Sequence, residues 1–172
     1  VYIIDSENLT TGTGYLAIQA ALLAESGVTP NEIVEEICRL RGKIEVSFVI
    51  DKLDYLKKGG RCSSVTAFGA NLLNIKPCIE VVHGAMTVGK KYRGPFQKCV
   101  LQYIKDRLEG RTDLKPDLML ITHAACSKEL VRAVQDTADQ YARFRSRYVT
   151  EAGCTVSSHC GPNTLGIIFA RV

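Results

Sequence analysis

Two spacings of apolar residues recur along this chain, and they predict which segments are helices and which are strands. Between residues 30 and 41, Ile33, Ile37 and Leu40 recur at intervals of three or four and would share one helix face. Short apolar runs such as 46–50 are typical of buried strands. The patterns predict helices at 10–26, 30–41, 53–57, 63–73, 94–108 and 127–144, and strands at 1–4, 46–50, 77–82, 85–88, 117–122, 147–150 and 165–170.

Residues with special backbone preferences mark the ends of these segments. Gly27 ends the first helix, and Pro30 suits the first turn of the second. His83 and Gly84 lie between two extended runs, which is typical of a two-residue β-hairpin loop. Ser127 precedes the last long helix, where its hydroxyl can accept a hydrogen bond from a free backbone amide.

The order of the elements predicts an α/β chain of the α+β type. Residues 44–172 combine a hairpin with helical crossovers, so we expect a mixed β-sheet flanked by helices. Residues 1–43 supply one strand and two helices, which are too few to close a layered core. We therefore expect residues 1–43 to be the C-terminal remnant of an N-terminal α/β domain, and residues 44–172 to form a C-terminal domain.

The composition is that of an ordinary globular protein, with 46% hydrophobic and 23% charged residues among 172. The net charge of +4 is mild, which argues against nucleic acid as a partner. No apolar run is long enough for a transmembrane helix, and the first residues lack the pattern of a signal peptide. Seven cysteines without a C-x-x-C pair indicate neither disulfides nor a zinc site, so we expect a cytoplasmic protein without a metal.

Two segments invite a chemical interpretation that their details do not favour. The Gly-Thr-Gly turn at 12–14 lacks the third glycine and the acidic residue of a dinucleotide site, and a strand-to-helix turn is the simpler interpretation. Cys160 would be a nucleophile only with a base in reach, and adjacent residues of an extended loop, such as His159, point apart. Cys154, His159 and Cys160 do not have the spacing of a usual zinc site.

Arg61 and His159 are stronger candidates. Arg61 follows Gly59 and Gly60, which let the backbone approach a neighbour closely, and a guanidinium matches a carboxylate or a phosphate. A structural salt bridge would explain Arg61 as well. His159 lies in a Gly/Pro-containing loop before the last strand and could bind an anion or only the backbone. One hypothesis is therefore a small-molecule enzyme that uses Arg61 and His159 on a phosphorylated or carbonyl substrate, and another is a purely structural or interaction domain.

These segments resemble the fingerprints of the DegV family, the bacterial fatty-acid-binding proteins. Residues 51–61 match its D-x-L-x-Y-L-x-x-G-G-R run, residues 72–77 match its L-L-x-I-K-P, and Arg93 falls where its K-x-R follows the hairpin. The segment around His159 resembles its H-T-G-P-G loop, with Cys160 in place of the Thr and Asn163 in place of the final Gly. Asn tolerates a left-handed backbone better than most residues.

The resemblance implies a carrier and not an enzyme, and this chain resembles the C-terminal part of the family. In the family a long-chain fatty acid lies in an apolar tunnel, and a separate fatty acid kinase subunit phosphorylates its carboxylate, a step of phospholipid metabolism. No cofactor besides the bound lipid is implied. Arg61 and His159 would lie near the carboxylate. The apolar tunnel candidates are Leu53, Phe68, Leu72, Ile75, Ile167 and Phe169.

Overall fold

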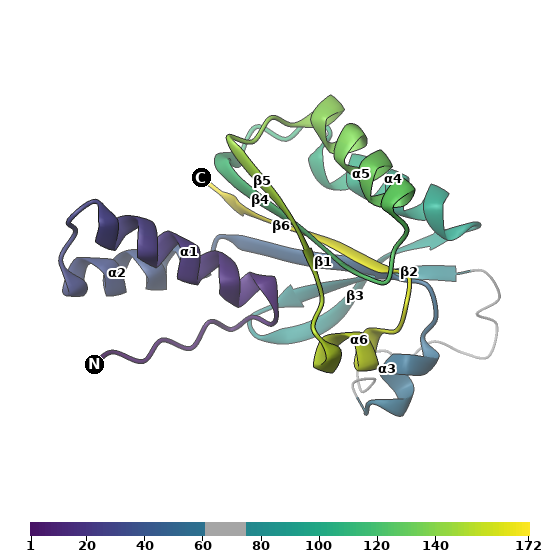
Figure 1. Ribbon diagram of the computed structural model, residues 1–172, viewed down its shortest axis with the longest axis horizontal. Helices are drawn as coiled ribbons and strands as arrows, with labels where there is room; N and C mark the ends of the chain where they lie inside the picture. Colours follow the sequence, from purple (N-terminus) through teal and green to yellow (C-terminus); the bar gives the residue numbers. More distant parts are fainter. Residues whose placement is uncertain (61–74) are drawn as a thin grey trace.

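A computed structural model describes residues 1–60 and 75–172, which form a six-stranded mixed sheet with helices on both faces (Figure 1). The strands are β1 (Ile44–Ile50), β2 (Ile75–Val82), β3 (Ala85–Arg93), β4 (Leu114–Ala124), β5 (Ser146–Glu151) and β6 (Thr164–Arg171). Their order in the sheet is β3-β2-β1-β6-β4-β5. The β4–β5 pair is parallel, and the other neighbouring pairs are antiparallel. The predicted α+β fold with a mixed sheet is confirmed.

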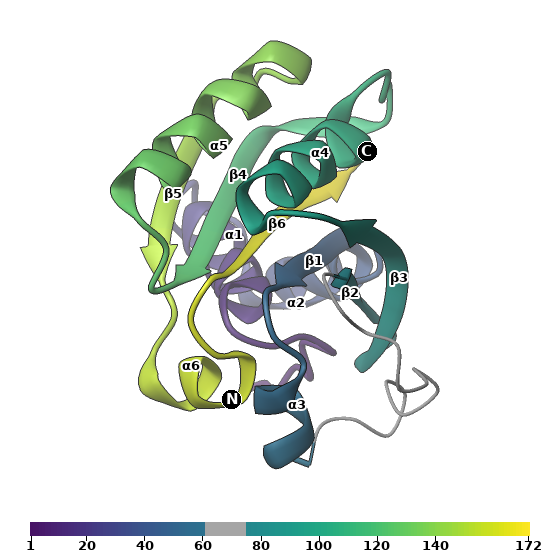
Figure 2. The same cartoon turned by 90° about the vertical axis from the view of Figure 1, so that its right-hand side faces the viewer.

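The described helices fall into three pairs. They are α1 (Thr11–Glu25), α2 (Pro30–Arg41), α3 (Asp54–Lys58), α4 (Phe96–Leu108), α5 (Lys128–Tyr141) and α6 (Cys154–Cys160). Figures 1 and 2 show α4 and α5 side by side on one face of the sheet, with α1 and α2 on the other side. The short helices α3 and α6 contact each other at one end of the sheet. None of these described helices combines the length and the apolar character that crossing a bilayer requires.

Successive side chains of the central strands point to opposite faces of the sheet and therefore pack in separate cores. In β6, Ile167 and Phe169 are fully buried in the core beneath α4 and α5. Ile168, between them, faces the core that Tyr15 of α1 shares with the sheet. A third core, around Phe48, lies where α3 and α6 meet the sheet. The face toward α1 therefore has two neighbouring clusters, one under α1 and α2 and one near α3 and α6.

Several local signals act as predicted. Thr29 and Glu32 form a capping box before α2, with Pro30 in its first turn. The Ser127 hydroxyl accepts the amide of Leu130 at 3.2 Å. His83 and Gly84 have φ angles of 48° and 75°, as the tight turn between β2 and β3 requires. The hairpin and the caps are confirmed.

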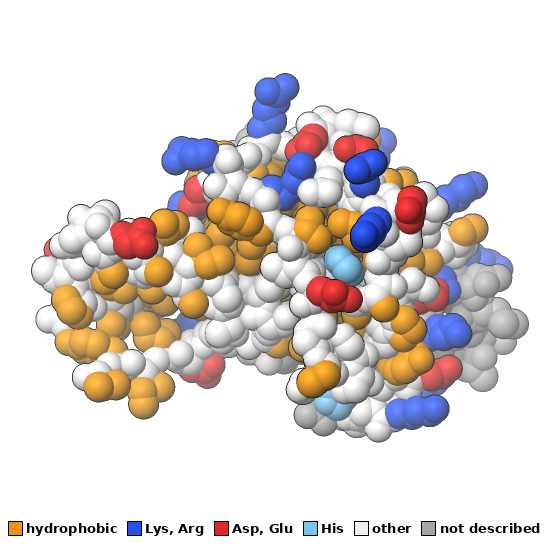
Figure 3. All heavy atoms as spheres, in the orientation of Figure 1, with side chains coloured by type: hydrophobic (Ala, Val, Ile, Leu, Met, Phe, Trp, Pro, Cys, Tyr) orange, Lys and Arg blue, Asp and Glu red, His pale blue; other side chains and the backbone are white. Residues whose placement is uncertain are grey.

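The predicted strand at residues 1–4 is wrong. No strand is assigned there, and the Ile3 side chain is 95% exposed. A strand needs a neighbour to satisfy its backbone, and none of the described strands pairs with this segment. Figure 3 shows hydrophobic side chains gathered at this end of the molecule, and Val1, Tyr2 and Leu22 are among those exposed. The domain boundary at residue 43 stays a prediction.

Candidate ligand-binding site

A narrow apolar crevice lies on the face of the sheet toward α1, between α6 and the loop that precedes α1. Its volume is about 30 Å³. The floor comes from β1, β6 and β4, and the walls come from the loop at residues 9–10 and from α6. The lining residues are Leu9, Thr10, Val46, Ser47, Phe48, Thr122, His123, Ala124, Ala152, Val156, Cys160, Thr164, Gly166 and Ile168.

The hydroxyl groups at the crevice are largely satisfied by each other. The Thr122 hydroxyl bonds to those of Thr11 and Thr150, the latter at 2.9 Å. The Thr164 hydroxyl donates to the carbonyl oxygen of Cys160 at 3.1 Å. Because paired hydroxyls need no water, the crevice offers a ligand mainly apolar surface.

His159 lies on α6, the helix that forms one wall of this crevice, but it is not one of the lining residues. The predicted extended loop is therefore wrong. His159 occupies the last turn of α6, in which Val156 and Cys160 line the crevice. The chain leaves α6 through Gly161 with a φ of 77° and reaches β6 through Asn163 with a φ of 56°. The expectation that Asn163 accepts a left-handed backbone is confirmed.

The imidazole of His159 rests on the backbone of Gly59. A Cβ atom built at position 59 would lie 3.0 Å from Cε1 of His159 and closer still to Nδ1. That Nδ1 atom is buried and has no hydrogen-bond partner among the described residues. The structure thus brings two fingerprint segments together, the glycines after α3 and the histidine of α6.

A second contact joins the same two segments, but here α3 supplies the ring and the segment after α6 supplies the glycine. A Cβ atom at Gly161 would lie 2.6 Å from Cγ of Tyr55, so the Tyr55 ring packs on that glycine. Each segment therefore supplies one ring and one glycine. Together they attach α3 to α6, the helix that forms one wall of the crevice.

Cys160 does not have the environment of a nucleophile. Its side chain is 6% exposed and packs in the cluster that contains Phe48 and Leu56. Burial raises the pKa of the Cys160 thiol to about 11, so it is protonated at neutral pH. Among residues 1–60 and 75–172, no group of three or more His, Cys, Asp or Glu side chains could hold a metal.

The predicted site residues are only partly brought together. Leu53 is buried in the cluster near α3 and α6, next to the crevice. Ile167 and Phe169 are correctly predicted as buried, but they face α4 and α5 and do not line the crevice. The reason is the alternation of β6, which points Gly166 and Ile168 to the crevice. Ile75 begins β2 and is half-buried. Arg61, Phe68 and Leu72 lie outside the described residues.

The crevice residues that the sequence analysis missed come from β1, β4, β6 and α6 and from the connecting residues Leu9, Thr10 and Ala152. Gly166 is the clearest example. A Cβ atom there would lie 2.5 Å from the carbonyl oxygen of Ser47 and 2.7 Å from Cβ of Phe48. A glycine inside an apolar strand is a recognised sign of close approach, and this signal was available in the sequence.

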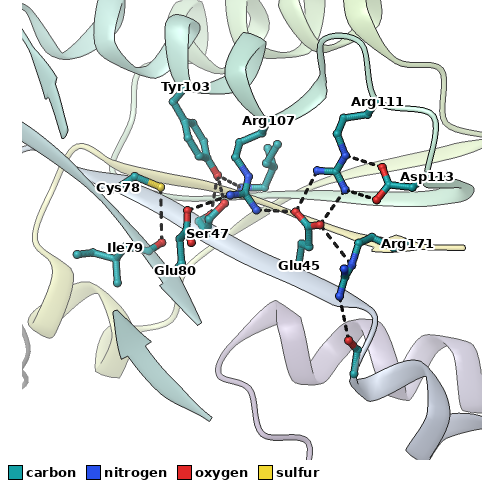
Figure 4. A network of polar contacts seen from close by, with 12 residues as sticks. Glu45, Ser47, Cys78, Ile79, Glu80, Tyr103, Arg107, Arg111, Asp113 and Arg171 are labelled. Atoms are coloured by element: carbon teal, nitrogen blue, oxygen red, sulfur yellow. Dashed lines mark hydrogen bonds and ion pairs between the residues drawn. The ribbon is translucent and has the colours of Figure 1, made fainter. Parts of the chain in front are cut away.

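A second hollow, of about 340 Å³, is lined by charged residues that neutralise each other. Figure 4 shows Arg107, Arg111 and Arg171 converging on Glu45. Arg107 also reaches Glu80 at 3.0 Å. Hydrogen bonds first to Asp113 and then to Glu45 raise the pKa of Arg111 above its usual value. The network connects β1, β2, α4 and β6, which indicates a structural role.

Comparisons with known proteins agree on one family. The family model described as "Uncharacterised protein, DegV family" matches residues 1–172. A DegV domain-containing protein of Clostridium acetobutylicum is 32% identical over 169 residues, covering 98% of this chain and 59% of the relative. Another, from Caldanaerobacter subterraneus, is 29% identical over 170 residues, covering 98% of this chain and 60% of the relative. The chain thus spans about 60% of the length of these curated relatives.

Solved structures show the same fold. A DegV family protein of Thermus thermophilus, described by its fatty acid binding, has a TM-score of 0.81 and 26% identity, covering 99% of this chain and 61% of the other. A DegV family protein of Ruminococcus gnavus, solved with vaccenic acid, has a TM-score of 0.84 and 20% identity, covering 97% of this chain and 59% of the other.

Proposed function

This chain belongs to the DegV family, and from that premise we propose that it binds a long-chain fatty acid as a carrier and not as an enzyme. The observation that supports this most is the apolar crevice, one wall of which is α6, the helix that carries His159. A second histidine, His123 of β4, lines the crevice itself. The acyl tail would lie over Phe48 and Gly166, and the carboxylate near the imidazole. The likeness to the fatty-acid-binding protein of Thermus thermophilus supports the same ligand.

Apolar burial supplies enough free energy for such a carrier. Each buried CH₂ group contributes about 0.8 kcal/mol, so a C16 tail contributes roughly 10 kcal/mol before ordering costs. The crevice, at about 30 Å³, has only the volume of about one water molecule. Its walls must therefore separate to admit an acyl chain, and α6, a helix of seven residues, forms one of these walls. Binding would thus move α6 relative to the loop at residues 9–10.

The proposal also includes a kinase partner, a role for Arg61 and a cytoplasmic location. A separate kinase subunit would phosphorylate the carboxylate of the bound acid, and Arg61 remains a predicted carboxylate ligand. The six described cysteines are unpaired, which supports a reducing cytoplasm as the location. An enzyme acting on a small phosphorylated substrate is a weaker candidate, because the crevice is lined mainly by apolar groups.

A pair of matched substitutions in the full-length protein tests the position of the tail. Ala152 lines the crevice, whereas Ala133 lies on α5, on the other face of the sheet, and both are half-buried. Ala152→Leu places three additional carbon atoms at the crevice and should lower the affinity for palmitic acid at least tenfold. Ala133→Leu should leave the affinity unchanged. Equal affinities for the two variants would contradict the proposed tail position.

A further inference from the structure

Position 59 requires a glycine because there is no space for a side chain, and not because of its backbone conformation. Its φ and ψ angles are −76° and −1°, a right-handed conformation that any residue adopts. Gly60, the next residue, has a φ of 69°, and no atom of residues 1–60 or 75–172 would lie within 4 Å of a Cβ atom added there. The feature that a side chain at position 59 would disturb is the imidazole of His159.

The contact also orients the ring. Nδ1 of His159 faces Gly59 and is buried without a hydrogen-bond partner among the described residues. Nε2 is then the ring nitrogen that remains for a ligand. Because Tyr55 packs on Gly161 in the second contact, α3 and the end of α6 hold each other in place around this ring.

We propose that Gly59 is a positioning residue for ligand recognition: its missing side chain lets the His159 imidazole lie against α3 and directs Nε2 to the polar end of the ligand. This inference rests on the proposed binding of a fatty acid. In the Gly59→Ala variant, the methyl group displaces the imidazole. Since an imidazole can rotate to another position and the backbone suits alanine, the variant should still fold.

The first test compares palmitic acid with its methyl ester, which lacks the anionic group. The full-length protein is measured as wild type, Gly59→Ala, His159→Ala and the double variant. Gly59→Ala should lower the affinity for the acid about tenfold, the scale of one hydrogen bond to a charged group, and change the affinity for the ester little. The double variant should bind the acid no more weakly than His159→Ala, because the alanine acts through the imidazole.

Gly153→Ala is the matched control. Gly153 precedes α6 and has an extended conformation that alanine adopts. Among the described residues, nothing lies within 4 Å of a Cβ atom added there. It should keep the wild-type preference for the acid. A Gly59→Ala variant with the wild-type preference would overturn the inference, and so would losses that multiply in the double variant.

A second measurement is independent of the ligand. The ¹⁵N shifts of the His159 ring, recorded by NMR, should change in Gly59→Ala and stay unchanged in Gly153→Ala. Unchanged shifts in Gly59→Ala would refute the positioning role even if the protein binds lipid. A wild-type protein that binds neither the acid nor the ester would instead overturn the proposed function, and with it the role assigned to Gly59 in recognition.

Discussion

Removing the hydroxyl of Tyr103 should destabilise the fold strongly, because that group is fully used inside the core. The Tyr103 side chain is fully buried, and its hydroxyl donates to the carbonyl oxygen of Ser47 at 2.7 Å. It also accepts from the Ser47 hydroxyl at 2.8 Å and from the Ile167 amide at 3.1 Å. Burial raises the pKa of Tyr103, so the hydroxyl stays protonated and keeps its donor.

Tyr103→Phe leaves polar groups of β1 and β6 without this partner. Each unsatisfied buried group costs about 1–3 kcal/mol, so we expect a loss of about 2–3 kcal/mol in the free energy of unfolding. For a protein of this size that corresponds to a fall in Tm of about 4–12 °C.

Tyr92→Phe is the matched control for this experiment. The Tyr92 hydroxyl donates to Asp106 at 2.9 Å, and that carboxylate also has Lys90 and Gln102 as partners. Its loss should cost about 1 kcal/mol. Thermal and urea unfolding measure both variants. A Tyr103→Phe protein as stable as Tyr92→Phe would show that the hydrogen bonds of the Tyr103 hydroxyl do not stabilise the core as described.

Three further predictions concern pH, reactivity and helix stability. Burial alone would raise the pKa of Asp106, but hydrogen bonds from Lys90, Gln102 and Tyr92 outweigh burial and lower the pKa. The wild type should therefore lose stability relative to Asp106→Asn as the pH falls below about 4, and thermal unfolding measures this loss. Iodoacetamide at pH 8 should modify the exposed Cys38 and Cys154 well before Cys160, whose pKa burial raises to about 11, and rapid labelling of Cys160 in a peptide map would contradict its burial. Gly14→Ala should stabilise the protein by about 0.5–1 kcal/mol, since Gly14 lies inside α1 with nothing within 4 Å of an added Cβ atom.

The sequence predicts elements well where a local signal decides them. Ser127 and Pro30 begin helices because their preferences depend on the nearest residues alone. The strand predicted at residues 1–4 fails for the opposite reason, since pairing depends on residues far along the chain. The apolar run at 165–170 correctly predicts a buried strand, but a strand buried on both faces has no polar side to show which residues face which core.

In the candidate site, too, the sequence predicts what a local pattern marks and misses what depends on residues far apart in the chain. His159 stands out in the sequence because glycine and proline follow it closely, and the structure places it on α6, the helix that forms one wall of the crevice. Its contact with Gly59 joins positions a hundred residues apart, which no local pattern reports. The crevice wall at residues 9–10 comes from the part of the chain that was predicted to belong to another domain.

The most direct test of the proposed function is a crystal structure of the full-length protein with palmitic acid. We expect a continuous acyl chain over Phe48 and Gly166, with the carboxylate within about 3.2 Å of Nε2 of His159. An acyl chain in the hollow beside Arg107, or a carboxylate remote from His159, would contradict that expectation.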